Sequence, residues 1–142
     1  MRDILFRGKR IDNGEWVEGG YFLEPYTDKT FIVTWNSFGL GFIDYIEVVP
    51  ETVGQYTGLN DMNGKRIFEG DIFRCDNAMG YVRFGTYASV YANKNTHIGF
   101  FIEWIIDRML RIDLAFWTEQ RKIEVIGNIH DNPELLKVEG EQ

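Results

Sequence analysis

Short apolar runs alternate with turn-forming residues along most of this chain. Glycine occurs 15 times in 142 residues, whereas proline occurs three times. Runs of β-branched and aromatic residues separated by Asn-Gly and Gly-Asp pairs are typical of strands joined by tight turns. The pattern therefore predicts a mainly β (β-rich α+β) protein, with a strongly bent sheet or partly closed barrel and short helical turns.

The clearest predicted element is a hairpin near the start. Residues Leu5–Ile11 and Trp16–Phe22 flank Asp12-Asn13-Gly14, where Asn and Gly tolerate the positive φ angles that hairpin turns require. Gly19-Gly20 interrupts the second of these strands. This predicts a bulge there, or a close approach of another backbone segment.

A second hairpin is expected in the centre of the chain. Residues Gln55–Thr57 and Lys65–Phe68 flank the turn Asp61-Met62-Asn63-Gly64. A strand over Ile67–Cys75 should follow, with a bulge at Gly70. The other expected strands are Phe31–Trp35, Phe42–Val49, Tyr81–Phe84, Ser89–Tyr91 and Lys122–Ile129, and helical turns are expected at Pro50–Thr52 and Asn132–Leu136.

The segment Gly99–Trp117 fits two patterns. Strand alternation places Phe100, Ile102 and Trp104 on one face, while helical spacing groups Phe101 with Ile105. We expect a strand near residues 100–105, followed by a short helix or an irregular piece. The apolar density of the segment makes it a candidate for self-association or partner contact.

Length and composition favour one domain over residues 1–142, with a frayed tail at 138–142. No apolar run is long enough to predict a transmembrane helix or signal peptide, and a single cysteine, Cys75, cannot form an internal disulfide. These features predict a cytoplasmic protein. The net charge of −7 is typical of a solvated acidic surface and disfavours nucleic acid as a partner. Two looser groups of cations could still form a local basic patch: Arg7, Lys9 and Arg10, and Arg108, Arg111, Arg121 and Lys122.

Candidate chemistry centres on two carboxylates that flank Gly70. On a regular strand Glu69 and Asp71 would face the same side, where they could act as an acid–base pair or bind a hard cation, with Asp61 joining if the hairpin folds back. The alternative is that Asp71 accepts hydrogen bonds from backbone donors in a turn and Glu69 faces water. The spacing of His97, His130 and Cys75 does not predict a metal site or a nucleophilic dyad. We therefore expect no metal, no cofactor and no catalytic residue.

Aromatic residues make up 15% of the chain, and they say more about its function than the carboxylates do. Tyrosine and tryptophan could fill a β core, anchor a protein interface or stack on nucleobases. We expect most of them to fill the core. A protein interface is the second explanation, and stacking on nucleobases is the third. The residues considered are Trp16, Tyr21, Trp35, Tyr45, Tyr56, Tyr87 and Tyr91.

Several sequence pieces, in order along the chain, carry a resemblance to a known family. They are Ile4-Leu5-Phe6-Arg7-Gly8-Lys9 with Trp16, then Gln55-Tyr56-Thr57-Gly58-Leu59, Asn63-Gly64-Lys65 and Glu69-Gly70-Asp71-Ile72, and finally the run from Val125 to Leu136. In these pieces the chain resembles the YopX-like proteins of phages and prophages. Residues from about Cys75 to Gln120 carry no landmark of that family.

The resemblance implies a phage or prophage protein in a bacterial cytoplasm, with a mainly β fold and self-association. It brings no established catalytic residue. The leading hypothesis is a non-enzymatic accessory protein that binds a host or phage protein. The alternatives are a nucleic-acid-associated regulator with a basic and aromatic face, and a small hydrolase that uses Glu69 and Asp71. The candidate partner-binding or motif residues are Gln55, Tyr56, Asp61, Glu69, Asp71, Phe101 and Trp104.

Overall fold

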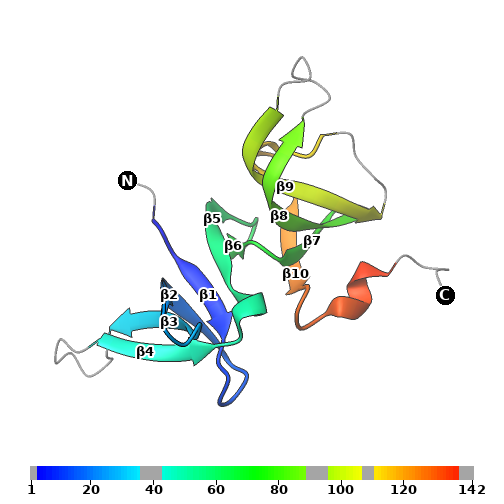
Figure 1. Cartoon of the computed structure of the whole chain (residues 1–142). Helices are drawn as coiled ribbons and strands as arrows, with labels where there is room; N and C mark the ends of the chain where they lie inside the picture. The colour runs from blue at the N-terminus through cyan, green and yellow to red at the C-terminus, as the bar shows by residue number, and fades with distance from the viewer. Residues whose placement is uncertain (1–2, 36–42, 89–95, 107–110, 138–142) are drawn as a thin grey trace. The chain divides into compact units, whose positions relative to one another are not determined.

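The computed structural model describes residues 3–35, 43–88, 96–106 and 111–137 of the chain. These residues form two compact units, residues 1–56 and residues 57–142 (Figure 1). The strands form two antiparallel sheets with the orders β4-β3-β2-β1-β5-β6 and β10-β7-β8-β9. The prediction of a mainly β fold is confirmed. No helix among the described residues is long and apolar enough to cross a membrane.

The first unit is built on consecutive antiparallel strands. They are β1 (Phe6–Lys9), β2 (Trp16–Leu23), β3 (Thr30–Trp35) and β4 (Ile43–Val48), followed by a 3-10 turn, η1 (Pro50–Thr52). The predicted first hairpin is present as β1–β2, and Gly14 in its turn has a φ of 72°. Gly19 shows the predicted close approach, because a Cβ built on it would lie 2.3 Å from the carbonyl oxygen of Val33.

The first unit's sheet curls until its far strand meets β1. Arg10 forms an isolated antiparallel bridge with Val48, the amide of Val49 donates to the carbonyl of Lys9 (2.8 Å), and the amide of Ile11 donates to Glu47 (3.1 Å). Gly8 allows this curl, because a Cβ at that position would lie 2.9 Å from the Val48 side chain. The sheet is therefore strongly bent, as predicted, without forming a closed barrel.

The central hairpin is also confirmed, but the strand after it is not as expected. β5 (Gly54–Asn60) begins in the first unit and continues into the second, where β6 (Arg66–Phe68) lies beside it. The predicted continuous strand over Ile67–Cys75 is wrong, because the chain turns at Glu69-Gly70 and re-enters a different sheet as β7 (Asp71–Cys75). Gly70 has a φ of 91°, a backbone conformation that favours glycine.

A long hairpin dominates the second unit. β8 (Ala78–Ala88) pairs with β9 (Thr96–Ile106). The expected short strand over Tyr81–Phe84 is thus part of a longer one, and the expected strand Ser89–Tyr91 lies outside the described residues. The expected order of secondary structure in Gly99–Trp117 is confirmed, since β9 is followed by a short helix, α1 (Leu114–Glu119).

The end of the described chain also follows the expectation. β10 (Ile123–Asn128) pairs with β7, and a 3-10 turn, η2 (Pro133–Leu136), comes after it. The register of β10 against β7 shifts between Val125 and Gly127, which is a bulge or irregularity in this strand. Asn132 does not cap η2 with its side chain, and its Oδ1 accepts a hydrogen bond from the amide of Asn128 instead (3.2 Å).

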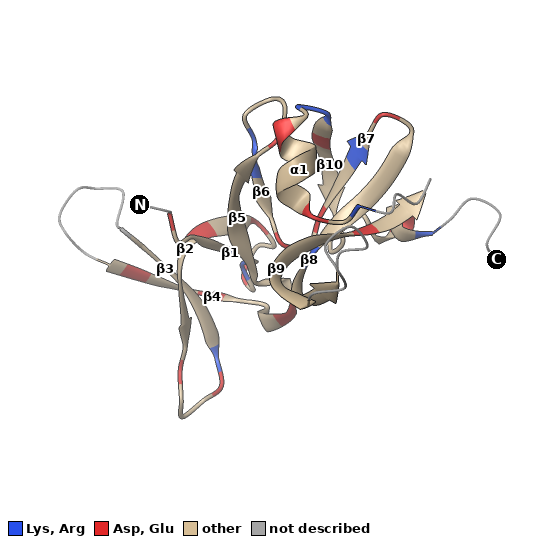
Figure 2. Ribbon diagram, turned by 90° about the horizontal axis from the view of Figure 1, so that it is seen from above, with Lys and Arg blue, Asp and Glu red and all other residues tan. Residues whose placement is uncertain are grey.

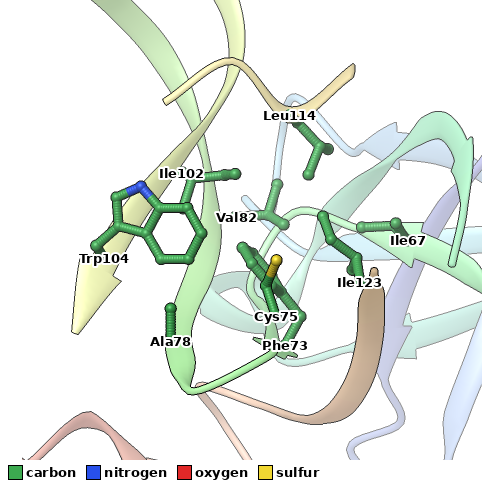
Figure 3. Packing of buried hydrophobic residues seen from close by; sticks show 9 residues of the cluster. All are labelled: Ile67, Phe73, Cys75, Ala78, Val82, Ile102, Trp104, Leu114 and Ile123. Atoms are coloured by element: carbon green, nitrogen blue, oxygen red, sulfur yellow. The ribbon is translucent and has the colours of Figure 1, made fainter. Parts of the chain in front are cut away.

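The main hydrophobic core lies in the second unit (Figure 3). Its side chains come from β6, β7, β8, β9, α1 and β10, so it depends on nearly every element of the unit. Phe73 lies within it with no exposed surface, and its ring packs edge to face on Trp104. The cluster comprises Ile67, Phe73, Cys75, Ala78, Val82, Ile102, Trp104, Leu114 and Ile123.

Candidate functional site

Asp61 organises the turn of the central hairpin. Its Oδ1 accepts hydrogen bonds from the amides of Asn63 and Lys65, both at 2.9 Å, and its Oδ2 accepts one from the amide of Val125 on β10, also at 2.9 Å. The side chain is 7% exposed. Both carboxylate oxygens are thus engaged with backbone donors, which makes Asp61 a structural anchor between the hairpin and β10.

The turn at Glu69-Gly70-Asp71 has a similar construction. Asp71 is 1% exposed, and its Oδ2 accepts a hydrogen bond from the amide of Phe68 (2.8 Å). Glu69 is half-buried and stands outside both flanking strands. The expectation of a regular strand that carries both carboxylates is therefore wrong, because Glu69 lies in the turn before β7. The alternative, that Asp71 satisfies a backbone donor, is the one the geometry supports.

Gly70 itself ties three segments together through its backbone. Its amide donates to the carbonyl of Val82 on β8 (2.8 Å), and its carbonyl accepts from the amide of Ile129 after β10 (2.9 Å). A Cβ at this position would also lie 3.7 Å from Nε2 of His130. Gly70, within the motif Glu69-Gly70-Asp71-Ile72, therefore links β8 and the segment after β10 through backbone hydrogen bonds.

The other two central candidates belong to β5. Gln55 is half-buried and pairs with Phe6 of β1. Tyr56 is 8% exposed, and its amide donates to the carbonyl of Leu5 (2.7 Å). Both residues therefore help to join β5 to the first strand of the chain.

Phe101 and Trp104 are buried in the second unit. Trp104 is 7% exposed, packs against Phe73 and Trp117, and donates from Nε1 to the carbonyl of Arg111 (3.1 Å). Phe101 is 9% exposed, with its ring centroid 5.3 Å from that of Tyr87. These two side chains stabilise the unit rather than form part of its surface.

An exposed apolar surface lies instead at the distal end of the β8–β9 hairpin. We call residues 84–88 and 96–100 the β8–β9 arm. Phe84 is 50% exposed and Ile98 is 77% exposed, and the Phe84 ring packs edge to face on Phe100. The absence of charged residues from 84–88 and 96–100 was the signal in the sequence that could have indicated this surface.

A second exposed apolar surface lies on the first unit's sheet. The rings of Phe22, Phe31 and Tyr45 contact one another with centroid separations of 6.3, 6.0 and 6.4 Å, and we call these three residues the outer aromatic cluster. Tyr45 was among the aromatic residues singled out in the sequence, whereas Phe22 and Phe31 were not. Cross-strand register brings them together, and a single sequence does not reveal register.

Within the two loose groups of cations, Arg10, Arg111 and Lys122 lie near acids, and Arg7 and Lys9 lie near the Trp16 ring. Arg10 pairs with Asp12 at 2.7 Å; this interaction raises the pKa of Arg10 and lowers the pKa of Asp12. Arg111 pairs with Asp113 at 2.7 Å, and Lys122 lies 3.4 Å from Asp76. Acidic residues lie on many elements of the described chain, as Figure 2 shows. Arg108 lies outside the described residues.

Among the described residues, cysteine and histidine do not form a cluster with other metal-ligating side chains. Cys75 is 1% exposed, and burial, with the nearby charge of Asp76, raises the pKa of its thiol. The ring of His97 packs on Tyr87, with centroids 5.4 Å apart. Within the part of the chain that the structure describes, no three His, Cys, Asp or Glu side chains are grouped so that they could hold a metal ion.

Comparison with known proteins gives a fold neighbour and a family. The crystal structure of protein EF1440 from Enterococcus faecalis is similar to this chain with a TM-score of 0.51 and 24% sequence identity, over 96% of this chain and 100% of that one. At this identity the likeness establishes the fold alone. A search of curated proteins gave no match. The family model described as YopX protein matches residues 5–137, nearly the whole chain, and the protein therefore belongs to the YopX family.

Proposed function

We propose that this chain is an accessory protein of phage or prophage origin that acts in the bacterial cytoplasm by binding a host or phage protein. Its action on this proposal is non-enzymatic. The observation that carries the proposal is the β8–β9 arm, an uncharged apolar surface on a chain with a net charge of −7.

The arm continues the core-facing side of its hairpin beyond the core. Val82 and Ile102 pair across the two strands and are each 1% exposed. The next pair on that side is Phe84 with Phe100, and the one after it is Thr86 with Ile98, which is 77% exposed. Apolar side chains therefore extend along one face from the core into solvent, which is typical of a protein-binding surface.

The charge distribution also makes the arm a place where two copies could meet. Two acidic molecules repel each other, and an interface without carboxylates avoids bringing like charges together. β9 is the outermost strand of its sheet, and such a strand can pair with a strand of another chain. Self-association through the arm is therefore part of the proposal.

The test is capture of partners by tagged protein from prophage-carrying bacterial lysate, with and without nuclease. A stoichiometric protein that survives nuclease and is lost with Ile98→Asp is the expected result. Ile11→Asp is the matched control, because Ile11 is also exposed, at 54%, and lies in the first hairpin. Partners that disappear with nuclease would favour the nucleic-acid alternative.

Self-association needs its own measurement. Sedimentation velocity over a range of concentrations should show a larger species that Ile98→Asp removes and Ile11→Asp retains. Turnover of a substrate by the pure protein, abolished by Asp71→Asn in a protein that is still folded, would overturn the non-enzymatic proposal.

A further inference from the structure

The outer aromatic cluster stands on the side of its sheet that faces away from Ile32 and Val48, the fully buried apolar residues in the described part of the unit. Phe22 pairs with Phe31 across β2 and β3, while the neighbouring Ile32 points to the opposite side and has no exposed surface. Tyr45 is 60% exposed and Phe22 is 42% exposed. Ile43, on the same side of β4 as Tyr45 by strand alternation, is 49% exposed. Contiguous apolar side chains of this kind mark a binding surface.

A carboxylate lies within this apolar surface. Glu47 pairs with Phe31 across β3 and β4, so it shares the outward side with the cluster, where it is half-buried. The unit as a whole is acidic, with nine Asp and Glu against five Lys and Arg in residues 1–56. A ligand that contacts the cluster and Glu47 together therefore combines apolar contact with positive charge.

The same side of the sheet already binds cations from its own strands. Trp16 pairs with Lys9 across β1 and β2. The guanidinium carbon of Arg7 lies 4.7 Å from the Trp16 ring centroid, and Nζ of Lys9 lies 5.7 Å from it. Both distances are within the range of cation–π attraction. The rings of the outer aromatic cluster offer the same chemistry to a cation from another molecule.

We propose that the outer aromatic cluster binds an extended basic segment of a partner protein, with an arginine or lysine directed at the rings and Glu47 and an apolar side chain two residues away. Alternate side chains of an extended segment point to one side, so both groups can reach the sheet together. This inference goes beyond the proposed function, because it concerns the first unit and does not depend on the β8–β9 arm.

The test uses three fluorescein-labelled peptides and the full chain, with binding followed by fluorescence anisotropy. In the first peptide, arginine and leucine alternate and are separated by single glycines. The second replaces arginine by glutamate, and the third replaces leucine by glycine. The first peptide should bind most tightly, the third more weakly, and the second should not bind.

Matched variants separate specific binding from general attraction to an acidic protein. Tyr45→Ser should weaken binding of the first peptide about 5- to 10-fold, and Glu47→Gln should weaken it about 2- to 5-fold. The controls are Tyr26→Ser, at a tyrosine that is 94% exposed in the turn after β2, and Glu51→Gln, at an exposed carboxylate in η1. Neither control should change the affinity beyond the general effect of charge.

Three outcomes would overturn the proposal. The first is an equal loss of affinity in each variant and its matched control. The second is equal binding of the arginine and glutamate peptides. The third is a concentration-dependent dimer that Tyr45→Ser abolishes without any peptide binding, which would make a second copy the occupant. Peptide binding that survives Ile98→Asp would show that this surface works whether or not the β8–β9 arm binds a protein.

Discussion

The two units of this protein use their apolar side chains differently. In the second unit, nine buried side chains from six elements form one cluster, and Phe73, Ile67 and Ile123 have no exposed surface. In the described part of the first unit, Ile32 and Val48 are the apolar side chains without exposed surface, while several aromatic rings stand in solvent. The second unit is thus built around burial, and the first around a tightly curled backbone with apolar groups left for contact.

The largest effect should come from opening a cavity in the second unit. Phe73→Ala removes a fully buried ring that packs on Trp104 with centroids 5.7 Å apart. The free energy of unfolding should fall by about 3–5 kcal/mol, because the variant loses the buried apolar surface of the ring and leaves a cavity in its place. Urea unfolding followed by tryptophan fluorescence measures it. Phe84→Ala, at a half-exposed ring of the same unit, should cost much less, and equal losses would contradict the comparison.

The next effect should come from removing a buried acceptor. Asp61→Ala leaves the amides of Asn63, Lys65 and Val125 without their present partner. We expect a loss of about 2–3 kcal/mol. Hydrogen exchange should show faster exchange at these three amides, while the amides of β2 and β3 keep their protection. Asp44→Ala, at an exposed carboxylate of β4, is the control and should have little effect.

In the first unit the sensitive positions should be glycines rather than large apolar residues. Gly19→Ala places a Cβ against the carbonyl oxygen of Val33, which is backbone and cannot move aside cheaply, whereas the nearest atoms to a Cβ at Gly20 are 3.9 Å away. We expect Gly19→Ala to cost about 1–3 kcal/mol. Gly20→Ala is the matched neighbour and should be nearly neutral. Thermal unfolding of both variants measures the difference. Equal losses of stability in Gly19→Ala and Gly20→Ala would show that the close approach at Gly19 does not limit stability.

The last prediction concerns the reactivity of the Cys75 thiol rather than the stability of the protein. The Cys75 thiol is buried and its pKa is raised, so less thiolate is present at a given pH than in the unfolded chain. Reaction with a disulfide reagent at mildly alkaline pH should be slow in the native protein and fast in urea. It should speed up in Phe73→Ala, because more frequent opening of the second unit exposes the thiol, and stay slow in Gly20→Ala.

Local sequence patterns predicted much of this fold. Both hairpins with Asn-Gly turns, the turn at Pro50 and the order of strand and helix in residues 96–119 follow from signals between neighbours in the chain. The break at Glu69-Gly70 was not predicted, because a glycine within an apolar run fits both a bulge and a turn. The choice depends on partners far along the chain, Val82 and Ile129.

The candidate residues show the same limit. The motif carboxylates could be found from sequence, and the backbone-accepting role of Asp71 was one of the two alternatives, but the bond from Asp61 to an amide 64 positions away could not be predicted. Phe101 and Trp104 were recognised as apolar, and only the fold shows that they are buried. Phe22, Phe31 and Tyr45 become a cluster through the register of β2, β3 and β4. Tertiary pairing therefore decides which residues act as surface.

The link from Asp61 to Val125 has a consequence for synthesis on the ribosome. All strands of the first unit, up to the start of β5, are present once residue 56 has emerged, and the β1–β2, β2–β3 and β3–β4 pairs join consecutive strands. The second unit needs β10 beside β7, and the Asp61 carboxylate cannot gain its third donor until residue 125 has been made. Strand pairing within residues 1–56 therefore does not wait for β10, whereas the core residues of the second unit stay incompletely covered until β10 has been made, which leaves them exposed to chaperones for longer.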